Sequence, residues 1–146
     1  MKTLLILLSL IVLPGLGSKA CDCDFLRFEY NAMAKGPREA AKVELDSNQY
    51  VFQAQVVKLK NRGNSAVVKV EKVWKGEITS KRVVMLSEKT NCDFLFEPGE
   101  VYIISVPFTE LKNKKVFVTS ICDFTFNVRD KYYQAFVKYL NQLDYK

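Results

Sequence analysis

Apolar and polar side chains alternate along much of the chain after residue 49, and this period of two predicts β-strands. The clearest run covers residues 50–57, and a second covers residues 66–71. Asn61-Arg62-Gly63-Asn64 lies between the two runs and has the composition of a turn. The two runs are therefore expected to form a β-hairpin.

Three further β-rich runs follow at residues 82–86, 101–106 and 116–121. Two segments with the composition of turns separate these runs, and they are Glu97-Pro98-Gly99-Glu100 and Lys112-Asn113-Lys114-Lys115. Five strands with no long helix between them predict a small, closed or nearly closed antiparallel β-barrel.

Two segments have a helical pattern instead. Residues 36–45 place Pro37 in the first turn, continue with good helix formers and end before residues 46–48. Near the C-terminus, apolar residues recur at helical spacing opposite a polar face of Lys131, Gln134, Lys138 and Gln142; they are Tyr133, Phe136, Val137, Leu140 and Leu143. This amphipathic helix is expected to pack on the barrel rather than on a partner or a membrane surface.

Residues 1–20 have the pattern of a secretion signal. Lys2 precedes an apolar run over residues 4–13, Pro14 and Gly15 interrupt it, and Ser18-Lys19-Ala20 suits signal peptidase. The run has about half of the roughly 20 residues that a membrane span needs, which disfavours an uncleaved anchor and a membrane span. We expect cleavage after Ala20, a mature single domain over residues 21–146, and a secreted protein, extracellular or, in a bacterium, at the periplasm or cell surface.

Removing residues 1–20 lowers the net charge from +6 to +4, because that segment carries Lys2 and Lys19 and no acid. The remaining lysines are spread along the chain rather than gathered in one block. This modest basicity favours loose attraction to an anionic polysaccharide over nucleic-acid binding.

All four cysteines, Cys21, Cys23, Cys92 and Cys122, belong to the segment expected to be exported, where an even number favours two disulfides. Cys21 and Cys23 are poor partners for each other, since residues two apart in an extended segment point the same way. Two pairings of this N-terminal pair with Cys92 and Cys122 remain open. A zinc site within the chain is disfavoured because no C-x-x-C motif and no histidine are present.

The order of several segments resembles the netrin-like module shared by tissue inhibitors of metalloproteinases and their minimal, single-domain bacterial relatives. The matching segments are Cys21-x-Cys23, residues 50–57, residues 70–76 with Val73-Trp74-Lys75-Gly76, Cys92 with residues 96–102, and Thr119-Ser120-Ile121-Cys122. The resemblance implies a mainly β, OB-like five-stranded antiparallel Greek-key barrel with flanking helices, including the C-terminal amphipathic helix. It also implies the disulfides Cys21 with Cys92 and Cys23 with Cys122.

The resemblance further implies inhibition of a zinc metalloendopeptidase. The α-amine and carbonyl oxygen of Cys21 would chelate the partner protease's zinc, Asp22 would enter its specificity pocket, and Thr90-Asn91-Cys92 would form a neighbouring contact ridge. Animal inhibitors carry a small hydroxylated residue where this chain has Asp22, and a carboxylate entering an apolar pocket would lose hydration.

Other functions fit the residues less well. The absence of histidine removes the usual Ser-His-Asp and Cys-His arrangements, and acid pairs such as Glu97 with Glu100 read as turn residues, so neither enzymatic activity nor a cofactor is expected. The alternative is a netrin-like module that binds a surface polymer or a secreted protein without inhibiting a protease. Its support is a set of lysines: Lys58, Lys60, Lys69, Lys72, Lys75, Lys112, Lys114 and Lys115. Lipidation of Cys21 is disfavoured, because Ser18-Lys19-Ala20 lacks the leucine typical of a lipobox and one cysteine would be left unpaired.

Overall fold

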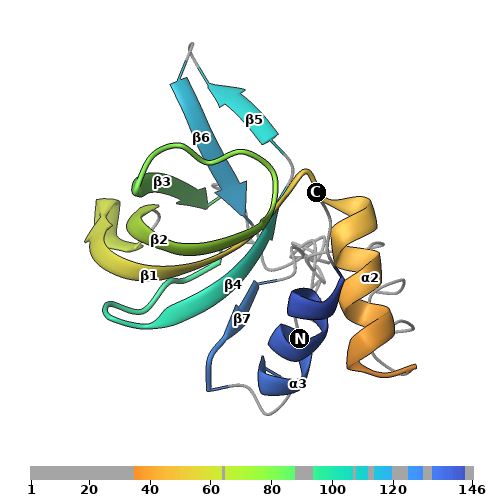
Figure 1. Cartoon of the computed structure of the whole chain (residues 1–146). Helices are drawn as coiled ribbons and strands as arrows, with labels where there is room; N and C mark the ends of the chain where they lie inside the picture. Colours follow the sequence, from red (N-terminus) through yellow and green to blue (C-terminus); the bar gives the residue numbers. More distant parts are fainter. Residues whose placement is uncertain are drawn as a thin grey trace, which may run out of the picture.

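The computed structural model describes residues 35–63, 65–87, 94–106, 108–111, 114–119, 125–129 and 133–143. This part of the chain is mainly β, with one mixed sheet and two α-helices, one of them near the C-terminus (Figure 1). The helices are α2 (Pro37–Ser47) and α3 (Tyr133–Gln142). The strands are β1 (Tyr50–Lys60), β2 (Ser65–Lys75), β3 (Arg82–Ser87), β4 (Val101–Val106), β5 (Phe108–Leu111), β6 (Lys114–Thr119) and β7 (Thr125–Asn127).

The five predicted strands are all present, as β1, β2, β3, β4 and β6. The predicted turn at residues 112–115 is wrong in part, because Lys114 and Lys115 belong to β6, where they pair with Leu111 and Glu110. The short strands β5 and β7 lie at the two ends of the sheet and were not predicted. Four and three residues are too few for an alternating pattern to be recognised.

The sheet has the order β5-β6-β3-β2-β1-β4-β7, which corrects two features of the predicted barrel. The sheet is mixed rather than antiparallel, because β3 and β6 pair in parallel. The described strands also do not close into a barrel. Closure would require β4 and β6 to pair through backbone hydrogen bonds. Instead, the outer edge of β4 pairs with β7 and that of β6 pairs with β5.

The β1–β2 hairpin turns through backbone in the left-handed region, at Asn61 (φ 51°), Arg62 (φ 57°) and Gly63 (φ 97°). Asparagine and glycine accept this conformation readily. The side-chain amide of Asn61 also donates a hydrogen bond to the hydroxyl of Ser65 across the turn, at 3.3 Å. The turn predicted at residues 61–64 is therefore confirmed for the described residues 61–63.

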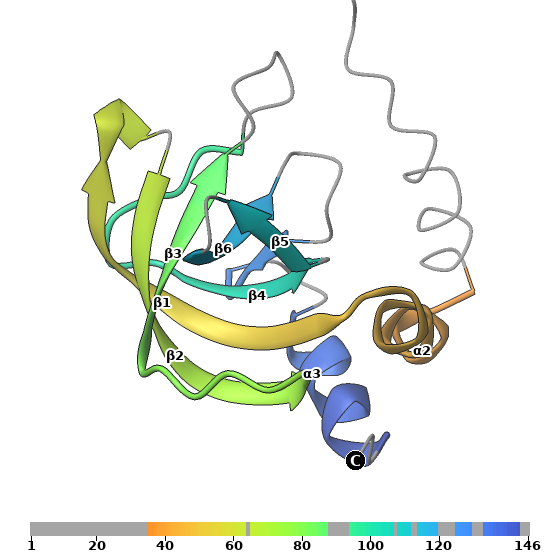
Figure 2. The same cartoon turned by 90° about the horizontal axis from the view of Figure 1, so that it is seen from above.

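Strands β1 and β2 bend together along their length, as Figure 2 shows. Their pairing register shifts at three places, between Val51 and Phe52, between Gln53 and Ala54, and between Val56 and Lys58. Such bulges add local bend and twist to a strand pair. The result is a curved sheet whose concave face encloses a core.

The concave face buries side chains from the central strands and from β6. Phe52, Met85 and Ile104 are fully buried there, and Phe117 of β6 contacts Phe52 with ring centroids 5.2 Å apart. Burial of large apolar side chains contributes about 1.5–3 kcal/mol each. This cluster therefore contributes substantially to the stability of the sheet.

The other face of the sheet is covered at one end by α2 and α3, which lie side by side (Figure 1). Leu45 of α2 and Phe136 of α3 are buried there against Val51 and Ile103 of the sheet. The prediction that the C-terminal helix packs its apolar face on the sheet is thus confirmed.

A chain of hydrogen bonds also ties α3 to the sheet. The hydroxyl of Tyr133 donates to Oε1 of Gln53 at 2.6 Å, and Nε2 of Gln53 donates to Glu71 at 2.8 Å. Burial, and secondarily the negative charge of Glu71, raise the pKa of Tyr133 above its usual value of 10.0. The phenol therefore remains a neutral donor throughout the physiological pH range.

Candidate functional site

The residues predicted to form the inhibitory site lie outside the described part of the chain. This holds for Cys21, Asp22 and Cys23, for Thr90, Asn91 and Cys92, and for Cys122. The structure does describe the residues on either side of the segments that contain Cys92 and Cys122.

The segment that carries Thr90, Asn91 and Cys92 begins after Ser87 and ends before Phe94. The backbone N–H of Phe94 donates a hydrogen bond to the hydroxyl of Ser87 at 2.8 Å, and Ser87 is buried. A buried side-chain hydroxyl thus joins the two ends of this segment.

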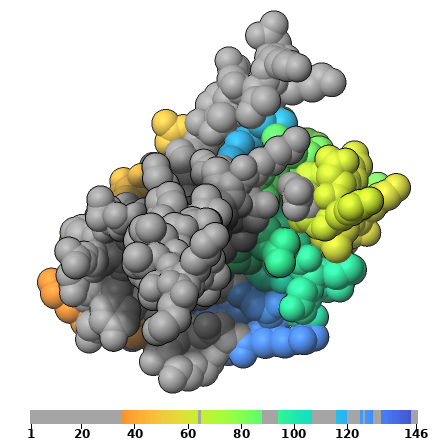
Figure 3. Space-filling model, turned by 180° about the vertical axis from the view of Figure 1, so that it is seen from behind, coloured from red at the N-terminus to blue at the C-terminus, as the bar shows by residue number. Residues whose placement is uncertain are grey.

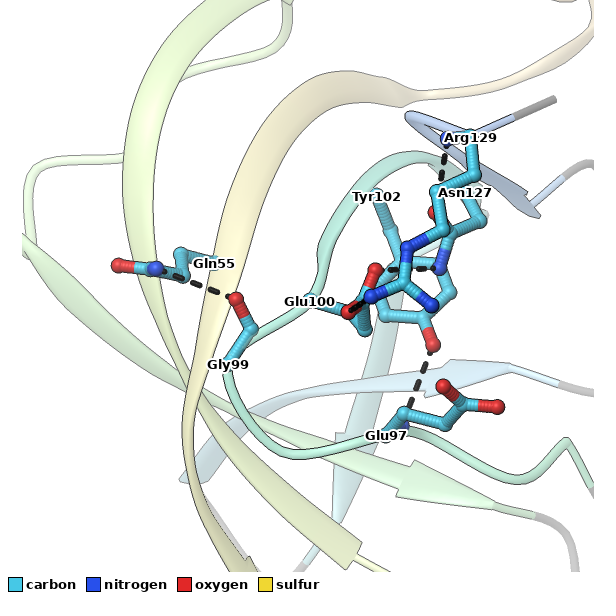
Figure 4. Close-up of polar contacts among 7 residues, drawn as sticks. All are labelled: Gln55, Glu97, Gly99, Glu100, Tyr102, Asn127 and Arg129. Atoms are coloured by element: carbon cyan, nitrogen blue, oxygen red, sulfur yellow. Dashed lines mark hydrogen bonds and ion pairs between the residues drawn. The ribbon is translucent and has the colours of Figure 1, made fainter. Parts of the chain in front are cut away.

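Three aromatic rings hold the chain that follows Cys92. The rings of Phe94 and Phe96 are 4.8 Å apart, and those of Phe96 and Tyr102 are 5.5 Å apart, all packed edge to face. The hydroxyl of Tyr102 also accepts a hydrogen bond from the backbone of Glu97 at 3.1 Å, as Figure 4 shows. Leu95, between the two phenylalanines, is 66% exposed, since its neighbours turn inward.

The segment that carries Cys122 is joined at its base in a similar way. It lies between Thr119 and Thr125, whose hydroxyls are 3.3 Å apart, and Thr119 is fully buried. Thr119 is also the register partner of Ser87 in the parallel pair β3–β6. The strands that precede the segments with Cys92 and Cys122 therefore run in the same direction and end at adjacent positions.

A polar network fixes β7, the strand after Cys122, to the turn before β4. Arg129 forms an ion pair with Glu100, and the amide of Asn127 donates to the same carboxylate at 3.1 Å (Figure 4). The backbone N–H of Arg129 donates to Asn127 at 2.9 Å, and Gln55 donates to the carbonyl of Gly99 at 3.2 Å. Glu100, considered from sequence as half of an acid pair with Glu97, thus binds a neighbouring arginine and asparagine.

The lysines considered for polymer binding do not form one surface where the structure describes their side chains. Lys72 donates to Asn141 of α3, and Lys75 donates to the carbonyl of Leu45 in α2, so both are engaged at the helical end. Lys58, Lys60 and Lys69 are exposed on the β1–β2 hairpin, which lies on the other side of the molecule from α2 (Figure 3). Lys112 lies outside the described residues, as do the side chains of Lys114 and Lys115.

Two kinds of feature are absent from the part of the chain that the structure describes. Within it, no three histidine, cysteine or acidic side chains are grouped so that they could hold a metal ion. No helix among the described residues is both long and apolar enough to cross a membrane.

Ser87, Thr119 and Thr125, which lie at the bases of the segments with Cys92 and Cys122, were not predicted from the sequence. Comparison of the chain with models of known protein families and with curated proteins found no match.

Proposed function

We propose that this chain is a secreted inhibitor of a zinc metalloendopeptidase that acts through the mature N-terminal residue, Cys21. One observation supports the proposal most strongly. Ser87 and Thr119 are paired in parallel strands, and the segments that contain Cys92 and Cys122 start directly after them.

The pairing of Ser87 with Thr119 matters because the segments that follow these two residues are short. Cys92 follows Ser87 by five positions, and Cys122 follows Thr119 by three. Since an extended chain spans at most about 3.6 Å per residue, chain length limits Cys92 to about 18 Å and Cys122 to about 11 Å from the ends of β3 and β6. These limits are compatible with disulfides from both cysteines to the single Cys21-x-Cys23 segment, and the resemblance to the netrin-like module implies the pairing Cys21 with Cys92 and Cys23 with Cys122.

The arrangement of the sheet also supports an OB-like fold. Strands β4, β1, β2 and β3 are neighbours in that order with antiparallel pairing, which is the Greek-key arrangement. OB-like barrels are themselves partly open, so the open sheet is compatible with this fold.

The proposed chemistry needs only groups that the chain possesses. An α-amine has a pKa of about 7.7–8.0, so part of it is neutral at physiological pH, and zinc binding favours that form further. The amine and carbonyl oxygen of Cys21 would take the coordination position that a catalytic zinc leaves open for water. Two disulfides would hold the terminus in place before binding and so lower the entropy lost on association.

The side chain of Asp22 provides a test of this binding mode. In a protease with an apolar specificity pocket, replacing Asp22 with threonine should strengthen inhibition about tenfold or more, because a carboxylate is costly to desolvate. The measurement is the inhibition constant of both proteins against a matrix-type metalloproteinase catalytic domain. Asp24→Thr is the matched control and should change little. Equal inhibition by the Asp22→Thr and unaltered proteins would mean that this side chain does not enter the pocket.

An alternative function is binding to an anionic surface polymer without inhibition, and one observation favours it. Lys58, Lys60, Arg62, Lys69 and Arg82 are all exposed around the β1–β2 hairpin and the start of β3. Retention on a heparin-like column that falls when these cations are replaced by glutamine, while protease inhibition is absent, would favour this function. Retention at low salt only, unaffected by the replacements, would count against it.

A further inference from the structure

A second candidate site lies at the opposite end of β3 from Ser87. It is a pocket of about 240 Å³ between the start of β1, the segment after β2 and the start of β3. Tyr50, Ile78, Val83 and Phe117 provide its apolar lining, and Glu77 and Arg82 are among the polar residues that line it. Because β3 separates it from the segments with Cys92 and Cys122, this pocket does not depend on the proposed inhibitory site.

The aromatic lining of the pocket is held in place by packing. The rings of Tyr50 and Phe117 contact edge to face with centroids 5.0 Å apart, and Phe117 is buried. Tyr50 also lies directly against Gly76, where an added Cβ would be 2.3 Å from Cδ1 of the tyrosine ring. Gly76 has φ +84°, a conformation that favours glycine. The pocket is therefore preformed rather than dependent on a loose side chain.

The lining of the pocket carries one cation, Arg82, and further cations lie next to it in the chain and in the sheet. Arg82 is exposed, the exposed Lys81 precedes it, and its register partner in β2 is the exposed Lys69. Glu77 is the single acid in the lining. Among the described residues the guanidinium of Arg82 forms no ion pair, so it is available to an anionic ligand.

We propose that this pocket binds a small aromatic carboxylate, with the ring against Tyr50, Ile78, Val83 and Phe117 and the carboxylate on Arg82. The size fits such a ligand. An apolar cavity of about 150 Å³ accepts benzene, so the larger pocket here has room for a ring and a short carboxylate arm. Edge-to-face contacts with Tyr50 and Phe117 favour an aromatic ring over an aliphatic chain, and guanidinium groups bind carboxylates through two parallel hydrogen bonds.

The test uses 3-phenylpropionate and its neutral analogue 3-phenylpropanol as probes. Each is titrated into the ¹⁵N-labelled protein, and amide shifts are followed by NMR for the unaltered protein, Arg82→Gln and Lys58→Gln. Lys58→Gln is the matched control, since it removes an exposed cation of the same sheet that does not line the pocket.

We expect saturable shifts at Ile78, Val83 and Phe117 with 3-phenylpropionate, and affinity about tenfold lower for 3-phenylpropanol and for Arg82→Gln, in keeping with a charge-assisted hydrogen bond. Lys58→Gln should bind 3-phenylpropionate like the unaltered protein.

The proposal is overturned if the shifts do not saturate or lie elsewhere, if both probes bind equally, or if Arg82→Gln and Lys58→Gln weaken binding to the same extent. None of these results bears on protease inhibition, which involves the other end of β3.

Discussion

Replacing Phe136 with alanine is expected to lower the free energy of unfolding by about 3–5 kcal/mol, the usual cost of removing a large buried ring. Phe136 is fully buried in the cluster that joins α3 to α2 and to the convex face of the sheet. The cavity left behind would be bordered by Leu45, Val51 and Ile103, which belong to three different elements. Local rearrangement therefore has little scope to fill it.

Urea unfolding followed by circular dichroism measures this effect. Gln134→Ala, an exposed position of the same helix, is the matched control and should change stability by no more than about 0.5 kcal/mol. A loss below about 1 kcal/mol for Phe136→Ala would show that α3 is not part of the folded core.

The strands and helices of this chain could be predicted largely from local pattern. The alternation in residues 50–57 identified β1, and Pro37 marked the first turn of α2. Alternation alone misleads in one respect, because it predicts that one face of β1 is buried and the other exposed. Val51 and Phe52 are adjacent and both fully buried, since the helices cover the convex face at that end of the strand.

The closure of the sheet could not be predicted in the same way. Whether β4 and β6 pair with each other depends on which strands occupy their outer edges. Those strands are β7 and β5, and they are only three and four residues long, too short to be recognised in the sequence. The parallel pairing of β3 with β6 is equally hidden, because β4 and β5 lie between them in the sequence. Non-local pairing of this kind leaves no periodic signal in either strand.

For the candidate site, the sequence identified the cysteines but not the described residues at the bases of their segments. Ser87 and Thr119 look like ordinary strand ends until the β3–β6 register makes them neighbours. The pocket beside Arg82 was missed for a similar reason. Tyr50, Val83 and Phe117 come from three strands, and only the folded sheet brings them together.

The second large effect concerns Cys21, the proposed first residue of the mature protein. Adding one alanine before Cys21 should weaken inhibition of a zinc metalloendopeptidase at least about a thousandfold, or about 4 kcal/mol. The extension turns the α-amine of Cys21 into an amide, which is a poor zinc ligand, and places an extra residue where the metal would lie. The fold should be unaffected, because the addition lies before the domain begins.

The most direct test of the proposed function compares the two proteins, starting at Cys21 and at the added alanine, against a panel of zinc metalloendopeptidases. Peptide mapping of both first confirms the initial residue, an unmodified amine on Cys21, and the disulfides Cys21 with Cys92 and Cys23 with Cys122. The account predicts that the protein starting at Cys21 inhibits at least one enzyme of the panel and that the extended protein, with the same disulfides, does not. Equal inhibition by both proteins, inhibition by neither, or an acylated Cys21 in the exported protein would contradict it.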